Sequence, residues 1–79
     1  VIDAAGKWIV PGFIDTHHSG GFFEDAVGLH WGDMLTSLAH GVTTAYAPNA
    51  GPSVYAFAEL VETGVAIGPR FFASGPSIR

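Results

Sequence analysis

Polar side chains that could do chemistry follow directly after a short apolar run near the start of the sequence. Phe13 and Ile14 form a brief run of the kind that lies inside a sheet, and residues 15–19 (Asp-Thr-His-His-Ser) come next. Binding sites of parallel sheets form at the carboxyl ends of the strands, so a polar cluster there usually takes part in chemistry. The chain has no cysteine, and any metal ligands in it must therefore be His, Asp or Glu.

The sequence after this cluster predicts two helices. Apolar residues recur at i, i+3, i+4, i+7 and i+8, which indicates one face of an amphipathic helix; these are Trp31, Met34, Leu35, Leu38 and Ala39. Gly41 is expected to end this helix with a positive φ angle. Ser53 is a favourable N-cap for a second helix, which Gly64 would close.

Strands are expected between and after these helices. The β-branched and aromatic segment 42–47 predicts one strand, and segment 70–74 predicts another. The strand centres near Ile14, Thr44 and Phe72 lie about 30 residues apart, the length of one βα unit. Alternation of strands and helices implies a parallel sheet.

The fold class predicted from this rhythm is α/β, as the first three strands and two helices of a (β/α)8 barrel. A closed barrel needs eight such units, so three would leave two bare edges. Residues 12–79 are assigned to the barrel, and residues 1–11 to the end of a small β-domain that contributes a short hairpin. A doubly wound open sheet is the alternative, although the sequence lacks its Gly-rich phosphate turn.

Composition limits the partners. The net charge is -4 with three basic residues, which argues against a nucleic-acid partner, and no apolar run approaches the roughly 20 residues needed to span a bilayer. Only 13% of residues are charged while 48% are apolar, so much of the apolar surface is expected to meet something absent from these residues. We interpret the chain as a piece of a longer protein, to be covered by the remainder of its own barrel.

Several blocks of the sequence resemble metal-dependent amidohydrolases. The first block runs from Val1 through Pro11-Gly12-Phe13-Ile14-Asp15-Thr16-His17 and resembles the opening of these enzymes. Residues 38–44 (Leu-Ala-His-Gly-Val-Thr-Thr) resemble the start of their second strand. Residues 58–60, 68–70 and 74–75 are similar to the imidazolonepropionase-like members and to those attached to TolB-like propeller domains.

The resemblance implies a barrel whose mouth holds one or two divalent metal ions, with zinc expected. An activated water would attack an amide or cyclic C–N bond of a small-molecule substrate. The family's first strand carries a His-x-His pair, and His17 matches its first member. Ser19 stands where the second histidine is expected, and the remaining ligands would lie beyond Arg79.

Alternatives at this site stay open. Serine is a poor ligand for these metals, and His18 would replace it only if a bulge re-aimed the strand end. Asp15 lies two residues before His17, so it is expected to face the same way; the resemblance implies that it holds the strand end and orients the ligand histidine. The simpler reading makes His17 and His18 solvated loop residues.

Other polar residues carry weaker predictions. His40 precedes a helix end and is expected to be structural, while His30 is expected to be exposed. Tyr46 and Asn49 lie near the end of the second strand and could touch substrate. Charged residues expected to face solvent are Glu24, Asp25, Glu59 and Glu62. The serines lack the context of a nucleophile elbow, and the catalytic base is not identified.

The function predicted from these observations is that of a metal-dependent hydrolase of C–N bonds, represented by its amino-terminal part. Alone, this part is expected to be inactive and prone to aggregate through its open edges. The alternative is a barrel that has lost its metal and serves as a binding or scaffolding module. Substrate, metal identity, compartment and homo-oligomer formation are left open.

Overall fold

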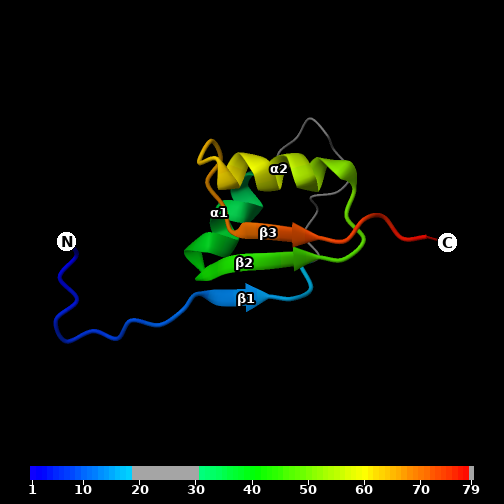
Figure 1. Ribbon diagram of the computed structural model, residues 1–79. Coiled ribbons are helices and arrows are strands. Elements are labelled where there is room, and N and C mark those ends of the chain that lie inside the picture. Colours follow the sequence, from blue (N-terminus) through cyan, green and yellow to red (C-terminus); the bar gives the residue numbers. More distant parts are fainter. Residues whose placement is uncertain (19–30, 79) are drawn as a thin grey trace.

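The computed structural model describes residues 1–18 and 31–78, which form a small α/β unit (Figure 1). Its elements in chain order are β1 (Phe13–Asp15), α1 (Trp31–Ala39), β2 (Val42–Ala47), α2 (Pro52–Glu62) and β3 (Arg70–Ala73). The strands are all parallel and lie in the order β1-β2-β3. The predicted sequence of elements and the parallel sheet are therefore confirmed.

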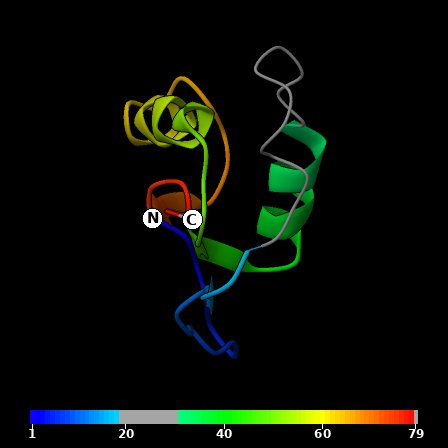
Figure 2. The same cartoon turned by 90° about the vertical axis from the view of Figure 1, so that its right-hand side faces the viewer.

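Both helices lie on the same side of the sheet (Figure 2). α1 packs on β2 and α2 packs on β3. Because side chains alternate along a strand, one face of the sheet is buried under the helices and carries Ala45, Ala47 and Phe71. The other face carries Ile14, Tyr46 and Phe72, which are 67%, 39% and 55% exposed. We call this second surface the open face; no described element covers it.

The hydrophobic core fills the space between the sheet and the helices. Its buried members are Met34, Ala45, Ala47, Ala50, Val54, Phe57, Ala66 and Phe71. The rings of Phe57 on α2 and Phe71 on β3 meet edge to face, with centroids 5.9 Å apart. Gly68 lies close beside them: a Cβ atom there would lie 3.2 Å from Phe57 Cζ, so the ring would have to shift by a few tenths of an ångström to accept one.

The ends of the helices agree in part with the sequence. Gly41 follows α1 with φ of +89°, and Gly64 follows α2 with φ of +75°, as predicted. The N-cap of α2 is Gly51 rather than Ser53, because the helix begins at Pro52, two residues earlier than a cap at Ser53 implies. Proline is well suited to this first position, where a backbone N–H would have no partner within the helix.

The apolar stripe predicted for α1 is buried only in part. Met34 is completely buried, whereas Leu35 is 45% exposed. α1 contacts β2 alone among the strands, so the flank that carries Leu35 has no described element against it.

The hairpin predicted for residues 1–11 is wrong. Gly6 makes the expected turn with φ of +73°, and the Lys7 N–H donates to the carbonyl oxygen of Ala4 at 3.0 Å. Neither flanking run forms a strand, and Trp8 is 94% exposed. Runs of three residues make too few ladder bonds to hold two strands together without a surface to pack on.

Truncation of the buried Phe57 should destabilise the protein strongly, and truncation of the exposed Tyr55 on the same helix only weakly. Phe57→Ala should lower the free energy of unfolding by about 3–5 kcal/mol, since it leaves a cavity beside Phe71. Tyr55→Ala, on the same helix but at a side chain 47% exposed, should change it by less than about 1 kcal/mol. Urea unfolding followed by circular dichroism measures both, and equal losses would contradict this core.

Candidate functional site

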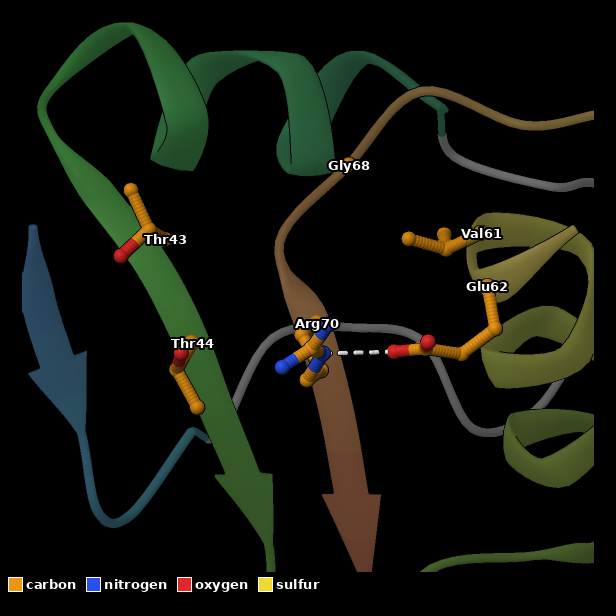
Figure 3. Close-up of a pocket in the computed structure, with 6 residues that line it drawn as sticks. All are labelled: Thr43, Thr44, Val61, Glu62, Gly68 and Arg70. Carbon is orange, nitrogen blue, oxygen red and sulfur yellow. Dashed lines mark hydrogen bonds and ion pairs between the residues drawn. The ribbon is translucent and has the colours of Figure 1, made fainter. Parts of the chain in front are cut away.

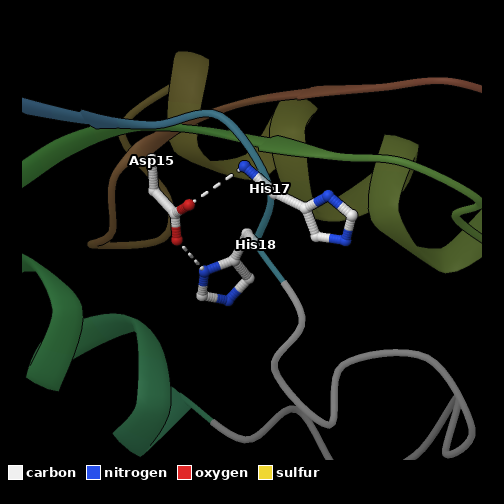
Figure 4. Close-up of polar contacts among 3 residues, drawn as sticks. All are labelled: Asp15, His17 and His18. Carbon is white, nitrogen blue, oxygen red and sulfur yellow. Dashed lines mark hydrogen bonds and ion pairs between the residues drawn. The ribbon is translucent and has the colours of Figure 1, made fainter.

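The polar tip of β1 is organised by the carboxylate of Asp15 (Figure 4). Its Oδ1 atom accepts the backbone N–H of His17 at 3.0 Å. Its Oδ2 atom lies 3.0 Å from Nδ1 of the His18 imidazole. A single carboxylate therefore holds both of the histidines that follow the strand, one by its backbone and the other by its ring.

His18 belongs to the layer between the sheet and the helices. Its side chain is 11% exposed, and its ring meets the buried ring of Phe71 edge to face with centroids 5.5 Å apart. The His18 N–H also donates to the carbonyl oxygen of Tyr46 at 2.9 Å. Asp15 pairs in register with buried Ala45, so its side chain starts from the same covered face.

His17 is exposed, and its imidazole points away from the Asp15–His18 pair (Figure 4). The expectation that the Asp15 side chain would face the same way as the His17 imidazole and orient it is therefore wrong, whereas Asp15 does hold the strand end through the His17 N–H. The strand ends at Asp15 and the backbone bends at Thr16 and His17, so the two-residue alternation no longer applies. The bend brings the residue three positions after Asp15, and not the second, beside the carboxylate.

The contacts of Asp15 act on its ionisation. The pKa of its carboxyl group is lowered from the ordinary value of 3.8, first by the hydrogen bond from the His17 N–H and then by the His18 ring. Both groups are better partners for the ionised carboxylate. At neutral pH the tip therefore carries a fixed negative charge.

The metal-ligand predictions are not tested by these contacts. Within residues 1–18 and 31–78, no group of three His, Asp or Glu side chains is close enough to hold a metal ion. His17 supplies one accessible imidazole, and Ser19 lies outside the described residues. A bulge was the condition for His18 to face the same way as His17 and replace the missing ligand. The register irregularity of the sheet falls between Phe13 and Ile14, before the tip, and does not turn His18 in that direction.

The ends of β2 and β3 are joined by a network that sequence reasoning missed. Asn49, in the left-handed region with φ of +61°, donates its N–H to Ser74 Oγ at 3.1 Å. Its Oδ1 atom accepts the Ser77 N–H at 2.7 Å. The turn composition around Pro48 and Asn49 predicted a loop, but its partner 25 or more residues away had no local signal. Asn49 therefore fixes the loop beside the tip. Tyr46, near the end of β2, is 39% exposed.

A groove lies at the opposite, amino end of β2 and β3 (Figure 3). It measures about 420 Å³ and is lined by Thr43, Thr44, Val61, Glu62, Gly68 and Arg70. Glu62 is exposed, as predicted, and its Oε1 atom accepts a hydrogen bond from Arg70 Nε at 2.6 Å. Both side chains are at least half exposed, so water and salt screen the pair and it adds at most about 1 kcal/mol.

The remaining predicted residues have minor places. His40 is exposed, and its Nδ1 atom lies 2.8 Å from the Thr36 carbonyl oxygen at the end of α1, which agrees with a structural role. Glu24, Asp25 and His30 lie outside the described residues. Neither of the helices at 31–39 and 52–62 has the length and apolar character of a bilayer-spanning segment.

Comparison with known proteins gives relatives without an assigned activity. A segment of 60 residues, 75% of this chain, is 48% identical to uncharacterized proteins of Mycobacterium bovis and of two strains of Mycobacterium tuberculosis. The match covers 9% of the length of each relative. No family model and no solved structure matches the chain.

The lowered pKa of Asp15 predicts a pH-dependent stability. The folded-state pKa is depressed, so the Asp15 contacts contribute fully above about pH 5 and are lost as the pH falls through the folded-state value below 3.8. The stability advantage of the natural protein over Asp15→Asn should therefore shrink as the pH is lowered. Urea unfolding of both proteins between about pH 6 and about pH 2 measures this difference. A constant difference would contradict an ionised Asp15 at the tip.

Proposed function

We propose that this chain forms the first arc of a (β/α)8 barrel in an amidohydrolase-like, metal-dependent hydrolase of C–N bonds. The observation that carries the proposal is the place of His17. It is an exposed imidazole at the carboxyl end of the first strand of a parallel sheet, within the sequence block that resembles these enzymes. Active sites of such barrels lie at this end of the strands.

The arrangement of the sheet supports the barrel. The strands follow chain order and both helices cover one face, as in the wall of a barrel (Figure 2). Ile14, Tyr46 and Phe72 make the open face apolar, and a barrel interior is filled by side chains of this kind. The open edges of β1 and β3 are where further strands would pair.

His17 would hold the metal ion together with ligands that the described residues do not supply. A bound divalent ion, with zinc expected, provides the Lewis acidity that lowers the pKa of water towards neutrality. Asp15 fixes the backbone of His17, while Asn49 holds the neighbouring loop in place. Tyr46 and Asn49, which lie near the end of β2, would line the approach of a small amide substrate.

Metal analysis tests this proposal. In the natural protein that carries the chain, His17→Ala should weaken metal binding by at least about 100-fold, because even residues that only support a ligand contribute 10–100-fold. His40→Ala is the matched control, since His40 is exposed at the end of α1 and hydrogen-bonds only locally. Equal metal content in His17→Ala and the natural protein would remove His17 from the site.

The second candidate function is a metal-free barrel that serves as a binding or scaffolding module. It is favoured by Ser19, which stands at the position expected for a second histidine ligand. Ser19→His should then create zinc affinity in a protein that has none. Calorimetric titration with zinc distinguishes the candidates, because a natural protein that already binds zinc rejects the metal-free one.

A further inference from the structure

We infer that Asp15 is a positioning residue, whose carboxylate seats His18 in the helix-covered layer and thereby leaves the His17 imidazole on the opposite side of the strand end. The first part of this inference rests on contacts within the chain. Its last step, that His17 is placed there to bind metal, rests on the proposed function.

The contacts that seat His18 come from three directions. Asp15 Oδ2 holds Nδ1 of the ring at 3.0 Å, Phe71 lies against the ring, and Tyr46 O accepts the backbone N–H. The side chain is left 11% exposed. A polar ring in this layer is tolerated because its charge-assisted partner is in place.

Seating His18 also decides the direction of its neighbour. With the His18 ring held against Phe71, the adjacent His17 side chain must leave the backbone on another side, and it is exposed there. Asp15 Oδ1 fixes the intervening bend through the His17 N–H at 3.0 Å. One carboxylate thus sets the direction of two neighbouring imidazoles. The two-residue alternation of a strand does not set it, because the strand has already ended at Asp15.

Amide exchange and proton NMR of the natural protein test the contacts without any metal. In Asp15→Ala the His17 amide should exchange about tenfold faster, because its hydrogen bond is lost. The His18 ring protons should also lose the ring-current shift caused by Phe71. Asp15→Asn should restore much of the protection at His17, because its side-chain oxygen still accepts that N–H.

The matched control is Asp3→Ala. Asp3 makes the same type of bond, with Ala5 N–H donating to its Oδ1 at 2.9 Å, but in the exposed segment before the sheet. It should change neither His17 exchange nor the His18 ring shifts. The contacts of Phe57 with Phe71, followed by their own ring shifts, report whether each variant is folded.

Zinc titration tests the last step. If His17 binds metal, Asp15→Ala should weaken zinc affinity by about 10–100-fold, and Asp15→Asn should restore part of it. Unchanged exchange and ring shifts in folded Asp15→Ala would overturn the positioning role altogether. Altered NMR signals with unchanged zinc affinity would overturn its link to the metal. A natural protein that binds no zinc would reject the proposed function and this last step, while the NMR result still decides the role of Asp15.

Discussion

The placement of both helices on one face of the parallel sheet determines most of what this structure can do. A connection between parallel strands must cross over a face, and crossovers of one hand between strands in chain order fall on the same side. α1 and α2 therefore bury the side that carries Ala45 and Phe71. Ile14, Tyr46 and Phe72 are left on the open face, because alternation gives every strand a second row of side chains.

The polar tip of β1 stands at the boundary between these two surroundings. On the covered side, a group as polar as an imidazole needs a partner, and Asp15 provides one for His18. The His17 imidazole points away from this pair and is exposed to solvent, so it does not require a carboxylate partner (Figure 4). Two adjacent histidines thus have different chemical characters, one supported within the layer and the other accessible to a ligand. A burial difference of this kind follows from the sheet, and the residue types alone do not reveal it.

Local rules explain why the elements were predictable. The helices and strands follow from apolar periodicity. The ends of the helices follow from Gly41 and Gly64, because a residue with a positive φ angle cannot continue a right-handed helix. The N-cap of α2 lies at Gly51, two residues before the predicted Ser53, because Pro52 is well suited to the first helical position.

Contacts that depend on the tertiary structure were missed. The Asp15–His18 pair forms after β1 has ended, so the alternation rule that placed Asp15 beside His17 was applied two residues beyond the strand. The pairing of β2 with β3 brings Asn49 to Ser74, and the packing of α2 on β3 brings Glu62 to Arg70. The hairpin expected before Pro11 is wrong for the opposite reason: here the local contact was predicted correctly. The turn forms, but no described element offers a surface on which two short strands could pack.

The two ends of the sheet differ in how firmly their polar groups are held. At the amino end, Arg70 and Glu62 pair in solvent beside an open groove, where screening leaves little energy to fix either side chain. At the carboxyl end, Asp15 is held by a backbone donor and a largely buried ring, and Asn49 is held by the hydroxyl oxygen of Ser74 and the backbone N–H of Ser77. Precise placement of a reacting group requires neighbours that cannot move independently of the sheet. Only the carboxyl end of this unit meets that requirement among the described residues, which is why the proposed site is located there and the groove is not part of it.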